Sequence, residues 1–155
     1  MEIFDLMTLS DRQYWVDAIG RCDWRAAHFL AQLLREDRFP SVLGADGKLF
    51  LMTDGTELVS FATLTHQDCV ADETLYPWIG FVFTAPAYRG HRYSGKLLDH
   101  ICMVAGEMGH HRVYLATDHV GLYEKYGFSY LESRMDVYDE ESRIYIRERN
   151  QEEVD

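Results

Sequence analysis

The stretch from Thr84 to Lys96 combines residue types that suit phosphate binding. An apolar strand is predicted to end before Pro86, a short basic turn follows, and a helix is predicted to begin at Tyr93. The first backbone N–H groups of a helix have no partner within the helix, and the helix dipole makes that end partly positive. This arrangement is suited to binding an anion.

Glycines and basic side chains strengthen this hypothesis. Gly90 and Gly95 permit unusual backbone dihedrals and the close approach of a ligand. Arg89, Arg92 and Lys96 can pair with phosphate oxygens, and such a basic cluster stands out in a chain of net charge −11. The alternative is an ordinary solvated turn. The sequence contains neither GxxxxGK(S/T) nor GxGxxG, which argues against a nucleotide triphosphatase and a Rossmann dehydrogenase.

Two runs resemble the signatures of a known family. The run TAPAYRGHRYSGKLL, from Thr84 to Leu98, resembles the acetyl-CoA loop of the GNAT superfamily of N-acetyltransferases. That loop has the signature Gln/Arg-x-x-Gly-x-Gly/Ala between a strand and a helix. The run LYEKYGF, from Leu122 to Phe128, is similar to the second signature of the family. The two runs stand in the order of the family, and with the element order the resemblance covers about residues 48–138.

Three departures from the family pattern concern the cofactor site. Arg89 fills the first signature position, but Arg92 stands where the family usually has Gly, and Ser94 where it has Gly or Ala. Arg92 is expected either to point outward or to contact phosphate itself, and Ser94 is small enough to keep the close approach. The Asn that often precedes the second signature, and contacts the pantetheine arm, is absent.

The resemblance implies a site for acetyl-CoA as co-substrate. Acetyl-CoA would lie between two splayed parallel strands, 78–84 and 113–117, with its pantetheine arm hydrogen-bonded along the first like an added strand. N–H groups of the basic turn would hold the pyrophosphate. A neutral amine would then attack the thioester directly, without an acyl-enzyme and without a metal. The implied cofactor-binding residues are Val82, Phe83, Thr84, Arg89, Gly90, His91, Arg92, Tyr93, Ser94 and Gly95.

Tyr123 occupies the position of the general acid of the family. A phenol with an ordinary pKa of about 10 can protonate a departing CoA thiolate. The alternative is a core tyrosine packed by a short helix. A non-catalytic acyl-CoA-binding module of the same fold is the second functional hypothesis, and the retained Tyr123 argues against it.

The sequence leaves the general base and the acceptor pocket open. An acceptor amine must lose a proton before attack, to a side chain or along a chain of waters. Tyr76, Trp78 and Phe81 either line the acceptor pocket or belong to the core. The adjacent His110 and His111 point apart and have no evident third ligand, so no metal site is expected. The candidate bases are His66, Asp68, Asp72, Glu73, Asp118 and His119.

Apolar periodicity and the resemblance together predict a mixed α/β fold. It has a central twisted mixed sheet, with antiparallel first strands, one parallel splayed pair and helices on both faces. Strand 78–84 reads as buried on both faces, and Asp118 is predicted to cap a short helix that Gly127 ends. The predicted helices span 10–21, 23 to before Pro40, 93–108 and 119–126. The predicted strands span 48–53, 57–64, 78–84, 112–117, 129–138 and 143–147.

Length and composition limit the class of protein. The 155 residues suit one domain, 1–155, with about 148–155 as a frayed tail, and 47% hydrophobic residues can form a core. The net charge of −11 disfavours nucleic acid and favours cationic amines. Three cysteines without CxxC spacing, no bilayer-length apolar run and no secretion signal predict a reduced cytoplasmic setting. The expected partner is a small-molecule or peptide amine, not a nucleic acid or membrane, and a homodimer is left open.

Overall fold

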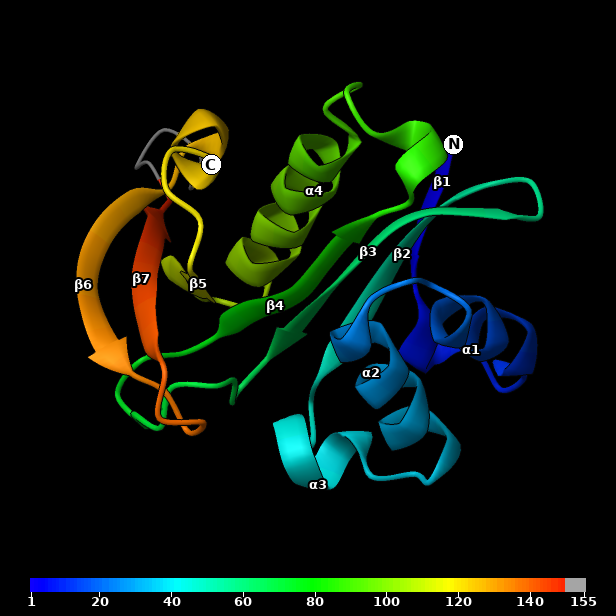
Figure 1. Cartoon of the computed structure of the whole chain (residues 1–155), viewed down its shortest axis with the longest axis horizontal. Coiled ribbons are helices and arrows are strands. Elements are labelled where there is room, and N and C mark those ends of the chain that lie inside the picture. Colours follow the sequence, from blue (N-terminus) through cyan, green and yellow to red (C-terminus); the bar gives the residue numbers. More distant parts are fainter. Residues whose placement is uncertain (150–155) are drawn as a thin grey trace.

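The structure, a computed structural model, describes residues 1–149 and forms a seven-stranded mixed sheet (Figure 1). The strand order is β1-β2-β3-β4-β5-β7-β6. The strands are β1 (Glu2–Asp5), β2 (Lys48–Asp54), β3 (Glu57–Thr65), β4 (Trp78–Thr84), β5 (Arg112–Thr117), β6 (Ser129–Met135) and β7 (Glu141–Glu148). The helices are α1 (Gln13–Gly20), α2 (Arg25–Arg35), α3 (Phe39–Leu43) and α4 (Tyr93–Glu107), with 3-10 turns η1 (Leu6–Thr8), η2 (Pro86–Tyr88) and η3 (Tyr123–Tyr126).

The sheet opens between β4 and β5, its parallel pair. Their register joins Trp78 to Tyr114 and Ile79 to Leu115, and no further pairs follow. Both strands continue beyond this point, β4 to Thr84 and β5 to Thr117. The carboxyl halves therefore diverge, which confirms the predicted splayed parallel pair.

Helices cover both faces of the sheet. α1, α2 and α3 pack on one face and α4 on the other (Figure 1). Side chains alternate along β3, so that Phe61 packs in the core beside α1–α3, whereas Ala62 and Leu64 pack in the core beside α4. The face of β3 that is turned toward α2 is therefore the face that carries Phe61.

The elements around the predicted cofactor site are confirmed. The strands 78–84 and 112–117 have the predicted bounds, and the helix after the basic turn begins at Tyr93 as predicted. Gly109 adopts φ +93° just beyond the last residue of that helix, as expected for a left-handed C-terminal cap.

Several predicted elements are wrong in detail. The predicted helix 119–126 is only η3, because Gly121 at φ +82° interrupts it, and Leu122 rather than Asp118 stands at its N-cap. The first helix begins at Gln13, after Arg12. β1 was not predicted. Nor was α3, whose Pro40 stands in the first turn, where the missing N–H does no harm.

The carboxyl-terminal part of the described chain also differs from expectation. Glu148 ends β7, and the Arg149 amide donates to the His111 carbonyl (2.8 Å), so these residues belong to ordered structure rather than to a frayed tail. The rest of that predicted tail, 150–155, lies outside the described residues. None of the helices within residues 1–149 has the length and apolar run needed to cross a bilayer.

Candidate active site

The carboxyl half of β4 is the open part of the sheet. Trp78 to Gly80 are buried, but Phe81 to Thr84 are only half-buried, so the prediction of a strand buried throughout is wrong. Phe81 adopts φ +50°, and the β3–β4 register shifts here by one residue, which marks a bulge. The bulge lies where β4 leaves β5, so it exposes backbone to the gap.

The backbone of β4 after the bulge has two orientations. The Ala85 amide donates to the Val59 carbonyl of β3 (2.8 Å), and Ser60 Oγ donates to the Phe83 carbonyl (2.7 Å). Because the backbone N–H and C=O groups of successive residues point to opposite edges of a strand, those of Val82 and Thr84 point to the gap instead, where the Thr84 carbonyl accepts from Arg89 Nε (2.9 Å). Of the three residues predicted to pair with pantetheine, the structure therefore presents Val82 and Thr84 and turns Phe83 toward β3.

The start of α4 lies directly after this open strand. Arg92 is its N-cap residue and makes no side-chain capping bond. The first helical hydrogen bond runs from the Lys96 amide to the Arg92 carbonyl (3.2 Å), so the amides of Tyr93, Ser94 and Gly95 precede the helical ladder. Uncapped amides at a helix start are donors for an anion. The residues present therefore fit the predicted pyrophosphate site.

Arg92 holds a conformation that favours glycine. Its φ of +60° and ψ of 27° lie in the left-handed region, which costs a side-chain-bearing residue about 1–2 kcal/mol. Arg92 thus adopts a backbone conformation that Gly adopts without this cost. The exposed Arg92 side chain adds positive charge next to the three uncapped amides.

Arg89 folds back over β4. Its Nε donates to the Thr84 carbonyl (2.9 Å), and its guanidinium lies 5.5 Å from the centre of the Phe83 ring. Arg89 therefore ties the basic turn to the end of β4. Gly90, at φ +86°, supplies the turn that brings the chain from Arg89 to α4. His91 packs against Tyr93, with ring centres 5.5 Å apart.

Gly95 lets η3 pack against the first turn of α4. A Cβ at Gly95 would lie 2.6 and 2.8 Å from two ring carbons of Tyr126. The Ser94 hydroxyl also lies 3.4 Å from the Tyr126 hydroxyl. This contact joins the two family signatures, and it fixes the position of η3, which contains Tyr123, relative to the start of α4.

We expect Gly95→Ala to destabilise the fold by about 1–3 kcal/mol, although Ala is the better helix former. The reason is that the Tyr126 ring is rigid and must move as a whole. Urea denaturation measures the effect, with Ser94→Ala as a matched control in the same turn. A Gly95→Ala protein as stable as the wild type would show that η3 is not held against α4.

Tyr123 is 7% exposed and packs against Phe128 and Tyr145. Within residues 1–149 its hydroxyl has no hydrogen-bond partner. The hydroxyl oxygen is not completely buried, in contrast to Thr63 Oγ1. The hydroxyl oxygen therefore retains an open side. Burial, with smaller contributions from Tyr126 and Asp118, raises the pKa of Tyr123 to about 12. The phenol is protonated at neutral pH.

The structure separates the candidate bases. His66 is exposed and stacks on Tyr76, and Glu73 and His119 are exposed as well. Asp72 accepts hydrogen bonds from Thr74 and pairs with Arg134, and these contacts lower the pKa of Asp72 to about 2.

Asp118 and Asp68 differ in their surroundings. Asp118 is exposed beside the start of η3. Asp68 is partly buried against β4, and burial raises its pKa. Asp68 alone among the six candidates is a carboxylate held against the open strand.

An aromatic cluster covers β4 on the α2 side. Trp24 stacks on Phe83 (5.5 Å between ring centres, 12° between planes), and Phe29 stacks on Phe81 (6.5 Å, 19°). Sequence reasoning found Phe81 as a candidate for the acceptor pocket but missed Trp24 and Phe29, which reach β4 only through the tertiary fold.

The other two aromatic candidates lie elsewhere. Trp78 is fully buried in the core with Tyr114, and Tyr76 is 44% exposed on the β3–β4 connection. Neither belongs to the cluster over the open half of β4. The structure thus divides the three residues that the sequence treated together.

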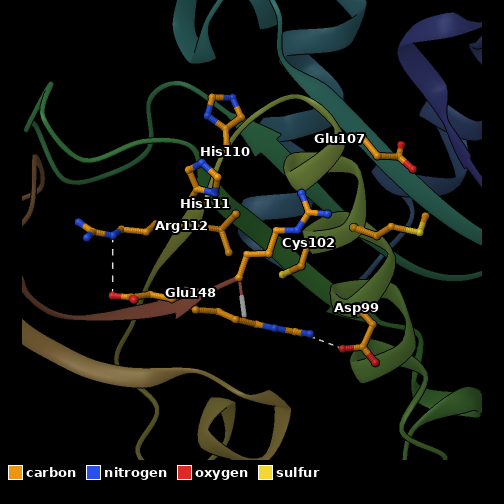
Figure 2. A pocket seen from close by; sticks show the side chains of 11 residues that line it. Asp99, Cys102, Glu107, His110, His111, Arg112 and Glu148 are labelled. Carbon is orange, nitrogen blue, oxygen red and sulfur yellow. Dashed lines mark hydrogen bonds and ion pairs between the residues drawn. The ribbon is translucent and has the colours of Figure 1, made fainter. Parts of the chain in front are cut away.

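A separate hollow of about 300 Å³ lies beside the second half of α4 (Figure 2). His110 and His111 line it at the turn before β5, and ion pairs border it between Asp99 and Arg147 (2.8 Å) and between Arg112 and Glu148 (3.7 Å). None of the predicted cofactor-binding residues lines this hollow. It is distinct from the gap between β4 and β5.

Comparisons with known proteins identify a family and a shared fold. The sequence model of the acetyltransferase (GNAT) family matches residues 9–128, which include both signature runs. No curated protein matches this chain.

Solved structures share the fold. A GNAT family acetyltransferase from Elizabethkingia anophelis with acetyl-CoA bound has a TM-score of 0.65 at 16% identity, over 95% of this chain and 97% of that one. The aminoglycoside 6′-N-acetyltransferase from Enterococcus faecium has a TM-score of 0.69 at 13% identity, over 96% and 97%. Escherichia coli ElaA has a TM-score of 0.64 at 20% identity, over 95% and 98%. With its family match over most of its length and this shared fold, the chain belongs to the GNAT family of acetyltransferases.

Proposed function

We propose that this protein transfers the acetyl group of acetyl-CoA to a primary amine by direct attack in a ternary complex. The observation that carries the proposal is the juxtaposition of the open half of β4 with the uncapped start of α4. Val82 offers its backbone groups and Thr84 its amide to the pantetheine arm, since Arg89 holds the Thr84 carbonyl, and the amides of Tyr93 to Gly95 offer donors to the pyrophosphate.

Tyr123 would act on the leaving sulfur. A phenol with a pKa of about 12 is a weaker acid than a thiol, whose ordinary pKa is about 8.5. Tyr123 therefore stabilises the developing thiolate by donating a hydrogen bond, and solvent completes the protonation. Such a contact is stronger in the transition state than in the ground state, so it raises the rate of transfer.

A panel of amines tests the proposal. Purified protein is incubated with acetyl-CoA and small amines, polyamines or peptides, and acetylated products are identified by mass spectrometry. The proposal predicts acetylation of at least one class of amine. The non-catalytic alternative predicts that acetyl-CoA raises the melting temperature by mass action while no amine is acetylated.

We expect cationic amines to be better acceptors than anionic amino acids. The chain carries a net charge of −11, and the aromatic cluster of Trp24, Phe29, Phe81 and Phe83 can contact an ammonium group. Raising ionic strength from about 0.01 to about 1 M shortens the Debye length from about 30 to about 3 Å, so the preference should shrink. A comparison of kcat/KM values at both salt concentrations measures this. A preference for acidic acceptors would contradict it.

A further inference from the structure

A carboxylate occupies the space that a side chain on β4 would fill. Asp68 lies in the connection between β3 and β4, and its Oδ1 would be 2.2 Å from a Cβ placed on Gly80. Thr63 Oγ1 would be 3.2 Å from the same point. Gly80 is therefore the residue that allows Asp68 and Thr63 to approach β4 together.

Thr63 adds an independent sign of a binding site. Its side chain is fully buried, and its hydroxyl is the single fully buried side-chain polar atom within residues 1–149 that lacks a hydrogen bond. Folded proteins rarely leave a buried hydroxyl unsatisfied. Thr63 lies two residues from Phe61 on β3, so it faces the α2 side of the sheet.

Asp68 has no cation as a partner. No ion pair to Asp68 occurs within the described residues, whereas its neighbour Asp72 pairs with Arg134. Burial raises the pKa of Asp68, and hydrogen bonds from the backbone and side chain of Cys69 oppose that rise.

The groups around Asp68 do not supply positive charge. The Cys69 thiol, whose pKa is raised to about 12 chiefly by burial, is neutral, and the negative charges of Asp68 and Asp136 contribute to that rise. The site is therefore electronegative and suits a cationic group.

The position of Asp68 connects it to the reaction. Gly80 immediately precedes Phe81, where the bulge begins and β4 becomes half-buried. Phe81 in turn stacks on Phe29 of α2. An amine that enters on the α2 side thus approaches a part of β4 where the Asp68 carboxylate at Gly80 and the aromatic cluster at Phe81 adjoin.

We propose that Asp68 is the general base that takes the proton from a primary alkylammonium acceptor, with Thr63 Oγ1 as a hydrogen-bond partner of the bound amine. This inference rests on the proposed acetyl transfer. The ammonium N–H proton passes to Asp68 Oδ1, and the freed nitrogen lone pair forms a bond to the thioester carbon. The C–S bond breaks, its electron pair leaves on the CoA sulfur, and a second proton from the amine nitrogen goes to solvent.

Asp68→Asn tests this assignment, because Asn keeps the shape and cannot take the proton. We expect turnover to fall about 100-fold or more, the lower end of general base effects. In the wild type, kcat/KM should fall as pH drops through the pKa of Asp68, since the protonated acid accepts no proton. Asp68→Asn should lose this acidic limb, and Asp68→Glu should restore part of the rate with such a limb. Glu73→Gln, an exposed neighbour, should leave rate and profile unchanged.

Thermal melting separates catalysis from a structural role. A carboxyl whose pKa is raised by folding is disfavoured in its ionised form, so stability falls as pH rises above its ordinary pKa. Asp68→Asn should therefore melt at pH 8 at the wild-type temperature or above it, with an unchanged shift on adding acetyl-CoA. A lowered melting temperature at an unchanged turnover would instead assign Asp68 a structural role and overturn the proposal.

These measurements distinguish failure of the base assignment from failure of acetyl transfer. If the wild type acetylates an amine and Asp68→Asn does so at the same rate with the same pH profile, the base assignment is overturned and the transfer function stands. If the wild type binds acetyl-CoA and acetylates no amine in the panel, the transfer function itself fails, and the base assignment fails with it.

Discussion

Replacing Tyr123 by Phe is expected to lower turnover about 10- to 1,000-fold, because loss of one hydrogen-bond donor to a charge that develops in the transition state typically costs about 100- to 1,000-fold and solvent replaces part of it. The hydroxyl has no hydrogen-bond partner within residues 1–149, so its removal should leave the melting temperature nearly unchanged. The affinity for acetyl-CoA should also change little, since the lost contact forms mainly in the transition state.

Tyr126→Phe provides the matched control for this variant. Tyr126 lies in the same 3-10 turn, and within residues 1–149 the one hydrogen bond of its hydroxyl is the 3.4 Å contact with Ser94. We expect this variant to keep nearly full turnover. A fully active Tyr123→Phe enzyme would show that Tyr123 does not stabilise the leaving thiolate, and it would leave acetyl transfer intact, because solvent can also donate hydrogen bonds to the sulfur.

Arg92→Glu is expected to weaken acetyl-CoA binding about 100-fold, since a charge-assisted hydrogen bond is worth about 1.5–3 kcal/mol and a carboxylate also repels the pyrophosphate. Glu would adopt the same left-handed backbone at the same cost, so the fold should be preserved. The measurement is the shift of the melting temperature by acetyl-CoA, which should almost vanish in this variant.

Two companion variants separate side chain from backbone. Arg92→Gly removes the charge, relieves the positive φ and keeps the amides of α4, so binding should weaken far less than in Arg92→Glu. Arg89→Gln should weaken acetyl-CoA binding by loosening the basic turn, because Arg89 Nε donates a hydrogen bond to the Thr84 carbonyl. If Arg92→Glu shows the wild-type shift with acetyl-CoA, the phosphates do not bind at the start of α4.

Local signals explain what the sequence predicted well. Three features that are set by residues close together in the sequence lie where they were predicted. They are the strand 78–84, the helix that begins at Tyr93 and the C-terminal cap at Gly109. The two signature runs also lie together, because Gly95 leaves room for the Tyr126 ring.

Features that depend on tertiary contacts escaped the sequence. β1 is only four residues long and gains its order from pairing with β2, and α3 is a single short helix around Pro40. The bulge at Phe81 is set by the β3–β4 register. The stacking of Trp24 and Phe29 on β4 joins segments far apart in the chain.

Asp68 illustrates the same limit at the candidate site. In the sequence it was one of six candidate bases without a distinguishing mark. Its approach to Gly80 and Thr63 arises only when the connection folds back over the sheet, and the same fold leaves Asp68 without an ion pair to any residue in 1–149. The spacing of these residues along the chain does not predict that contact.

A rapid-quench single-turnover experiment tests direct transfer at this site most directly. The protein is saturated with acetyl-CoA, mixed with the best amine of the panel, and quenched at intervals for measurement of free CoA, acetylated amine and intact protein mass. Direct transfer predicts that free CoA and acetylated amine appear together in equal amounts, that no acetylated protein forms, and that CoA is not released without amine. Release of CoA before the acetylated amine, with an acetyl group on the protein, would contradict it.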